Sequence, residues 1–183
     1  YLAHPYGQPV IGWSSDIDHL SKSQLEKYYR TYYVPENITI AVAGDINPKQ
    51  VKKWARLYFG PWEKAPDPPE VTVEEPEQEG RRSFKINSMR KPVYVRAYHT
   101  VEQGNEDFLA LDLLASVLSR GRTSLLYSNL VQDKRLAAKI TAFNGFPGKK
   151  FPSLFGFFAV PNAGVKLSEI AEGIDKQLQK VKD

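Results

Sequence analysis

The sequence predicts an α+β protein in which helices pack on a largely antiparallel sheet. Short runs of β-branched and aromatic residues have the length of strands, and longer segments carry apolar residues at helical spacing. In the second part of the chain these segments follow the order ββααββα, which is typical of a helix layer on one sheet. The length of 183 residues fits one large domain or parts of two.

The first part of the chain, residues 1–62, is expected to form a helix, a strand and a helix after a turn-rich start. The first helix should begin after Ser21, which has a glutamine three residues later as in a capping box, and should end before Pro35. Residues 38–43 (ITIAVA) are an apolar run that predicts a buried strand. A second helix should begin after Asn47. Both helices carry apolar residues that are expected to face a core: Leu25, Tyr28, Tyr29, Tyr32, Val51, Trp54, Ala55 and Tyr58.

Residues 63–80 differ in composition from both flanks. They contain seven acidic residues, four prolines and one lysine. Such a segment cannot bury a core, and its composition favours an extended, solvated chain. We therefore predict a linker between two structural units.

The second unit, residues 81–183, is predicted to contain four strands and three helices. The strands are expected at 83–86, 92–99, 137–143 and 154–160. Two helices are expected at about 105–119 and 123–133, and the third lies at the end of the chain. Helical spacing predicts the following core residues: Phe108, Leu111, Ala115, Leu118, Leu126, Leu130, Leu167, Ile170, Ile174, Leu178 and Val181.

Composition excludes several classes of protein. The chain has no cysteine, so it can form neither disulfides nor cysteine-ligated zinc or iron–sulfur sites. The net charge of +4 is spread over separate basic pairs, whereas nucleic-acid-binding proteins cluster their basic residues. No nucleic-acid partner is therefore expected, and a nucleic-acid-binding domain is only a remote alternative. No apolar run has the length of a membrane span. The chain begins without methionine or a signal peptide, and we expect it to be cut from a longer protein.

The three histidines do not form a recognisable metal site. Catalytic zinc commonly uses two histidines one helical turn apart, together with a carboxylate. His4, His19 and His99 have no partner at that spacing, so each is expected to have a structural or surface role. We predict no metal ligand and no catalytic residue in this chain.

Other constellations also favour structural interpretations. A Ser–His–Asp triad cannot be read from sequence alone, but no strand–G-x-S-x-G–helix elbow is present. Residues 121–124 (GRTS) follow a predicted helix, which favours a turn with Thr123 or Ser124 as helix cap over a phosphate site. Two carboxylate pairs lie in loops or first helical turns, where the helix dipole favours acidic residues: Asp16 with Asp18, and Glu106 with Asp107. From the residues alone, the sequence indicates a soluble two-part α+β protein without a visible catalytic set.

The order of several short motifs resembles zinc metallopeptidases of the insulinase-like family, which includes pitrilysin and mitochondrial processing peptidase. Each motif is short, and the resemblance depends on their order over nearly the whole chain. The motifs are His4–Gly7 (HPYG), Ile11–Gly12, Tyr32–Asn37 (YYVPEN), Ala41–Ile46 (AVAGDI), Tyr58–Trp62 (YFGPW), Gly121–Tyr127 (GRTSLLY) and Leu136–Ala137.

The resemblance implies which part of such a peptidase this chain is. Family members are built from repeated α/β units that enclose a chamber. Their zinc ligands, an H-x-x-E-H helix and a later glutamate, precede the stretch that resembles HPYG. The chain would then be the tail of the metal-bearing unit (1–62), the linker (63–80) and the first part of the non-catalytic second unit (81–183). Zinc is expected in the longer protein and not in this chain, with a bacterial origin and a cell-envelope location.

One departure from the family pattern concerns substrate binding. In many active members an arginine in the second unit, and a tyrosine seven residues later, hold the substrate backbone and the tetrahedral intermediate. The corresponding positions here are Val131 and Ala138, whose side chains cannot donate a hydrogen bond. Substrate-binding residues in this chain are therefore not identified from sequence.

Two functional hypotheses follow from the resemblance. In the first, the chain is the non-catalytic portion of a zinc-dependent endopeptidase and contributes structure and part of the substrate-contacting wall. In the second, it belongs to a catalytically inactive scaffold or binding partner of a peptidase. The expected partners are peptide or unfolded-protein substrates and the other parts of the peptidase or a homologous subunit. A homodimer through exposed sheet edges is also expected, because unpaired strands invite pairing with another copy.

Overall fold

The computed structural model describes residues 1–86 and 91–182, and it divides the chain into two compact units, Tyr1–Pro76 and Glu77–Asp183. The boundary falls inside the acidic, proline-rich segment 63–80. Residues 63–79 form no helix or strand, as expected for a segment that is rich in proline and like charges. The role of this segment as a linker stays a prediction.

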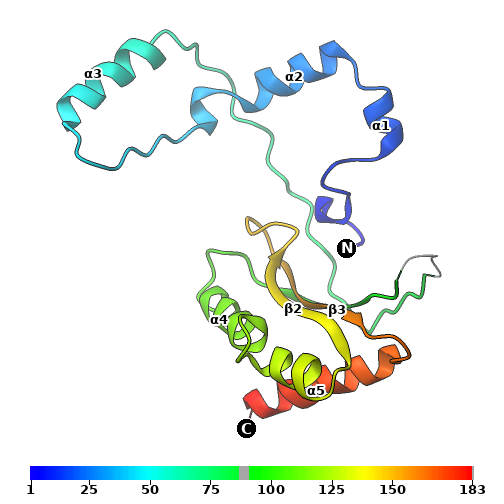
Figure 1. Ribbon diagram of the computed structural model, residues 1–183. Helices are drawn as coiled ribbons and strands as arrows, with labels where there is room; N and C mark the ends of the chain where they lie inside the picture. Colours follow the sequence, from blue (N-terminus) through cyan, green and yellow to red (C-terminus); the bar gives the residue numbers. More distant parts are fainter. Residues whose placement is uncertain (87–90, 183) are drawn as a thin grey trace. The chain divides into compact units, whose positions relative to one another are not determined.

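The first unit consists of short helices joined by irregular segments (Figure 1). Two of the predicted helix starts are confirmed in detail. The Ser21 hydroxyl accepts a hydrogen bond from the Gln24 backbone N–H at 3.3 Å, and the Gln24 side chain accepts one from the Ser21 N–H at 2.8 Å. Asn47 Oδ1 accepts from the next helix at 3.0 and 3.4 Å. The elements are η1 (Pro5–Gly7), α1 (Ser14–Asp18), α2 (Lys22–Tyr32), η2 (Pro35–Asn37) and α3 (Pro48–Phe59).

Two sequence predictions for the first unit are wrong. Residues 38–43 form no strand, and Ile40 is 55% exposed. A strand needs a neighbour for its backbone hydrogen bonds, and no described segment pairs with this one. The apolar faces of α2 and α3 are not buried either, because no other element of the unit covers them. In this unit, all of whose residues the structure describes, only His4 and Val34 are buried.

The second unit is an antiparallel three-stranded sheet with helices, so the α+β class is confirmed. The strand order is β1-β3-β2, and β3 pairs with both neighbours. The two predicted strands 137–143 and 154–160 are present and longer than expected. The elements are β1 (Tyr94–Thr100), α4 (Phe108–Ser119), the π-helix η3 (Tyr127–Asp133), β2 (Ala137–Phe146), β3 (Ser153–Pro161) and α5 (Leu167–Lys182).

The predicted first strand, 83–86, is absent, so the observed order is βααββα. Phe84 and Ile86 are 87% and 88% exposed. Their alternation with Ser83 and Lys85 has the period of a strand, but alternation alone does not supply a hydrogen-bonding neighbour. Residues 87–90, which follow, lie outside the described part of the chain.

The core of the second unit lies on one face of the sheet. Alternate residues of β2 and β3 point to this face, where Ala142, Phe157 and Ala159 pack with α4 and α5. Figure 1 shows both helices on the same side of the strands. Sequence periodicity identified most of this core, since seven predicted residues are buried: Phe108, Ala115, Leu118, Leu126, Leu130, Ile170 and Ile174. Leu111 and Leu178 are partly buried, whereas the prediction is wrong for Leu167 and Val181, which are 39% and 42% exposed near the ends of α5.

The opposite face of the sheet carries apolar side chains that no described helix of the unit covers. Val95 of β1 pairs with Phe158 of β3, and Phe158 pairs with Thr141 of β2. These residues alternate with those of the core face, and Val95 is 60% exposed. We call this surface, defined by Val95, Thr141, Phe143 and Phe158, the open sheet face.

Candidate functional site

The two positions at which the resemblance would place substrate-binding groups lie on adjacent elements of the second unit. Val131 belongs to η3 and packs partly buried against the core, while Ala138 lies in β2 and is exposed. The pairing of β2 with β3 shifts between Ala137 and Lys139, so Ala138 occupies a bulge. The two positions thus lie on elements that contact each other, but neither side chain can donate a hydrogen bond.

Two hydrogen bonds to backbone carbonyls hold the turn between these positions. Arg135 has φ 50°, in the left-handed region that favours glycine. The Asn162 side chain donates to the Arg135 carbonyl at 2.6 Å, and the Leu136 N–H donates to the Leu130 carbonyl at 2.8 Å. These bonds fix the path from η3 into β2. Their donors are one side-chain amide and one backbone N–H, so they add no acid, base or nucleophile.

The three histidines occur in different local settings. His4 is buried and its Nδ1 accepts the Tyr6 backbone N–H at 3.1 Å, whereas His19 follows α1 with Nδ1 2.7 Å from the Ser15 carbonyl oxygen. His99 lies on β1 opposite Leu154. Over residues 1–86 and 91–182, no three histidine or acidic side chains gather in a way that could hold a metal ion. The side chains described in this chain therefore do not fit a catalytic zinc ion.

The other candidate groups have structural contacts. The Ser124 hydroxyl donates to the Gly121 carbonyl at 2.8 Å, so it closes the turn rather than capping a helix N–H. Asp107 stands directly before α4 without a capping bond from its side chain. Asp16 lies in the first turn of α1, where the sign of its charge suits the helix dipole. None of these groups meets a base or nucleophile that would indicate acid–base chemistry.

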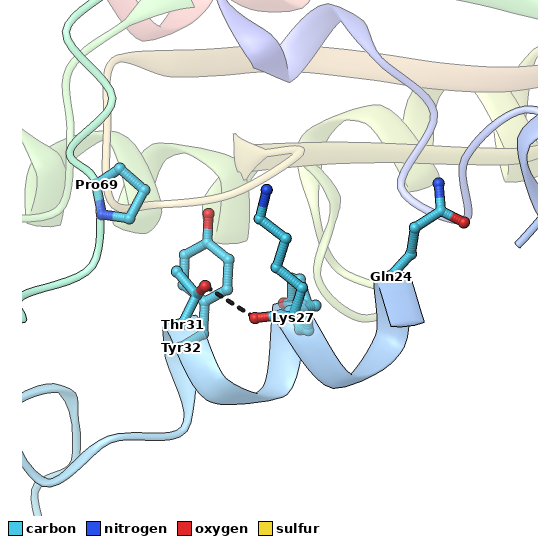
Figure 2. Close-up of a pocket in the computed structure, with 6 residues that line it drawn as sticks. Gln24, Lys27, Thr31, Tyr32 and Pro69 are labelled. Carbon is cyan, nitrogen blue, oxygen red and sulfur yellow. Dashed lines mark hydrogen bonds between the residues drawn. The ribbon is translucent and has the colours of Figure 1, made fainter. Parts of the chain in front are cut away.

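A pocket of about 320 Å³ lies in the first unit between α2 and the acidic segment (Figure 2). Within it the Thr31 hydroxyl donates to the Lys27 carbonyl at 2.8 Å. The tyrosine rings and the proline give the lining an apolar character, and it includes no carboxylate or imidazole. The lining residues are Gln24, Lys27, Tyr28, Thr31, Tyr32 and Pro69.

A polar cluster on the core face of β1 was not anticipated from the sequence. Arg96 forms a two-point ion pair with Asp175 of α5, and its Nε donates to the Tyr94 hydroxyl at 2.9 Å. Burial alone would lower the pKa of Arg96, but the hydrogen bonds to Asp175 and Tyr94 raise it above its ordinary value. The signal that could have revealed the cluster is the arginine in the alternating strand sequence YVRAY, on the side that faces the helices. Its role is to fasten α5 to the edge strand.

A second contact missed by sequence analysis involves Glu75. Its carboxylate accepts hydrogen bonds from three consecutive backbone N–H groups, those of Leu2, Ala3 and His4, at 2.6, 2.9 and 3.0 Å. Desolvation alone would raise the pKa of Glu75, but the three hydrogen bonds outweigh it and, with the Tyr1 α-amino group, lower it to about 2. No local pattern distinguishes Glu75 from its acidic neighbours, because its partners lie more than seventy residues away.

None of the described helices combines the length and apolar character that crossing a bilayer requires.

Comparison with known proteins identifies relatives along the whole chain. A zinc protease, PqqE, of Helicobacter pylori is 30% identical over 186 residues, covering 100% of this chain and 41% of the relative. The uncharacterised zinc protease YmxG of Bacillus subtilis is 26% identical over 147 residues, covering 79% of this chain and 34% of the relative. The chain therefore spans less than half the length of these relatives.

Solved structures agree with the fold. The crystal structure of a protease from Helicobacter pylori matches with a TM-score of 0.91 at 29% identity, covering 100% of this chain and 44% of that one. A peptidase M16 inactive domain from Pseudomonas fluorescens matches with a TM-score of 0.79 at 18% identity, over 98% of this chain and 43% of that one, which supports the fold alone. The family model described as "Peptidase M16 inactive domain" matches residues 19–183. The chain thus belongs to the insulinase-like M16 peptidase family and matches its inactive domain.

Proposed function

We propose that this chain is the non-catalytic portion of a longer zinc-dependent endopeptidase that encloses peptides in a chamber. The proposal is supported by membership of the inactive-domain family and by relatives that are named zinc proteases. The chain spans less than half of those relatives, which leaves room for a separate metal-bearing part. The observation that carries the proposal is the match of residues 19–183 to the family model described as the peptidase M16 inactive domain.

The domain assignment from sequence is part of this proposal. Residues 1–62 would be the tail of the metal-bearing unit, 63–80 the linker, and 81–183 the first part of the non-catalytic unit. Exposed apolar faces on α2 and α3 support the first assignment, because such faces favour burial against another part of the protein. The remaining parts of the peptidase, or a homologous subunit, are the proposed partners.

A cleavage assay tests this function directly. The longer protein should cleave a quenched fluorescent peptide, a zinc chelator should abolish the activity, and added zinc should restore it. This 183-residue chain alone should have no activity in the same assay. Chelator-resistant cleavage by the longer protein, or cleavage by this chain alone, would contradict the proposal.

The open sheet face is the surface that we propose contacts substrate. An apolar, partly exposed sheet face can bind apolar peptide side chains by removing both surfaces from water. Val95 is suited to this role because it is 60% exposed on β1 and its side chain points away from α5.

Substitution of Val95 tests whether the open sheet face contacts substrate. In the longer protein, Val95→Asp should lower kcat/KM for an apolar peptide by roughly three- to tenfold, through lost apolar contact. Stability should change little, because the side chain is exposed. Leu109→Asp is the matched control, since Leu109 is 77% exposed on α4, away from the open sheet face. Equal losses of kcat/KM in the two variants would show that the effect is not local to the open sheet face.

The alternative proposal is a catalytically inactive scaffold or binding partner of a peptidase. It is favoured by Val131 and Ala138, which cannot supply the hydrogen bonds that the resemblance assigns to those positions. An H-x-x-E-H sequence in the longer protein, together with chelator-sensitive cleavage, would exclude this alternative. A homodimer is a further proposal, supported by the unpaired outer edges of β1 and β2 in the described sheet.

A further inference from the structure

We propose that Glu75 is a conformational latch that closes the first unit into a ring and fixes the point at which the chain leaves it. The carboxylate reaches back from the end of the unit to three successive N–H groups at its start, and both of its oxygens accept hydrogen bonds. Converging N–H groups of successive residues form a concave anion site of the kind called a nest. Here the anion is the Glu75 carboxylate of the same chain. Its binding to the nest therefore holds the segment around Glu75 against residues 2–4.

The latch matters because few side chains of the first unit are buried. Only His4 and Val34 are buried in this unit, whose residues are all described. Apolar burial therefore contributes little to its arrangement, and specific polar contacts must contribute more. The bonds to Glu75 join residues that are 71–73 positions apart in the sequence, and the bond from the Ala65 N–H to Glu36 at 3.3 Å joins residues that are 29 apart.

The residues that supply the nest are themselves fixed by packing. The buried His4 ring lies edge-on to Tyr6, with ring centroids 4.6 Å apart, and Tyr1 packs 5.9 Å from each of them. Gly7 allows this approach, because a Cβ there would lie 3.2 Å from the Tyr1 Cβ. The packing of Tyr1 against the HPYG motif thus holds the N–H groups of residues 2–4 in a preformed arrangement. The latch requires neither zinc nor peptide cleavage.

Glu75→Gln tests the latch with little change of shape. The amide oxygen of glutamine accepts hydrogen bonds, but its NH₂ group cannot, so the three-fold arrangement is lost together with the charge. Amide hydrogen exchange at Leu2, Ala3 and His4 should accelerate by roughly tenfold or more, as expected for the loss of charge-assisted bonds. Glu74→Gln is the matched control, since Glu74 is exposed beside the latch, and it should leave these rates unchanged.

The rigidity of residues 71–73, which precede Glu75 in the chain, gives a second readout. Backbone relaxation of Val71 and Val73 should show ordered behaviour in the native protein and in Glu74→Gln, and increased motion in Glu75→Gln. Unchanged far-UV circular dichroism and unchanged exchange within β2 and β3 would show that the variant is folded. A folded Glu75→Gln variant with native exchange at residues 2–4 and native relaxation at 71–73 would overturn the proposal.

The unmodified protein provides an independent test by pH. The titratable groups that interact with the carboxylate are the α-amino group and the phenol of Tyr1. The imidazole of His4 belongs to a residue whose backbone N–H donates to the same carboxylate. The folded pKa of Glu75 lies below the ordinary value of 4.5, so the stability contributed by the latch is complete above pH 4.5 and is lost as pH falls toward 2. Amide protection at residues 2–4, corrected for intrinsic exchange, should persist at pH 3.5 and disappear near pH 2. Loss of protection already at pH 4.5 would contradict the latch.

Discussion

We expect Phe157→Ala to lower the free energy of unfolding of the second unit by roughly 3–5 kcal/mol, the usual range for a fully buried phenylalanine. Phe157 is 0% exposed at the centre of β3 and packs edge-on to Phe155, with ring centroids 5.6 Å apart. Removal of the ring loses its transfer free energy and leaves a cavity in the core that α4 and α5 share with the sheet. Urea unfolding followed by far-UV circular dichroism measures the change.

The neighbouring residue provides the control for this prediction. Phe158 lies on the open sheet face and is only partly buried, so Phe158→Ala should cost about 1–2 kcal/mol in proportion to its smaller burial. If the two alanine variants were equally stable, the assignment of the core to one face of the sheet would be wrong.

Gly156→Ala should destabilise the second unit by about 1–3 kcal/mol although it adds one methyl group. A Cβ at this position would lie 2.5 Å from the Arg96 carbonyl oxygen and 2.6 Å from the Phe143 ring. The phenylalanine can rotate, but the carbonyl belongs to β1, which pairs with β3 along its whole length. Relief of the clash therefore requires displacement of an edge strand.

Gly104→Ala controls for the general effect of replacing glycine. No atom lies within 4 Å of a Cβ built there, and Gly104 does not have a left-handed backbone. This variant should change the free energy of unfolding by no more than about 0.5 kcal/mol. A Gly156→Ala variant as stable as Gly104→Ala would contradict the close packing of β1 against β3.

Local sequence signals predicted the second unit better than the first. The apolar faces that helical spacing predicts for α4 and α5 pack against the sheet of the same unit. Residues such as Leu118 and Ile174 are therefore buried as expected. The same spacing in α2 and α3, and the apolar run at 38–43, meet no partner within their unit. Periodicity identifies a surface that favours burial, but it does not identify what covers that surface.

The polar contacts were the least predictable features. Arg96 and Asp175 are far apart in sequence, as are Glu75 and its nest, and a contact of this kind depends on the tertiary fold. Capping contacts were predictable because donor and acceptor lie within three residues, as at Ser21 and Asn47. The expectation that this chain carries no zinc motif rests on histidine spacing alone and stays a prediction.

Zinc content measured side by side tests the central claim most directly. The longer protein and this 183-residue chain would be dialysed under the same conditions, analysed for metal and assayed with the same peptide. We predict about one zinc per molecule, with cleavage, in the longer protein, and neither in this chain. Stoichiometric zinc in this chain, or a longer protein without metal and activity, would contradict the account.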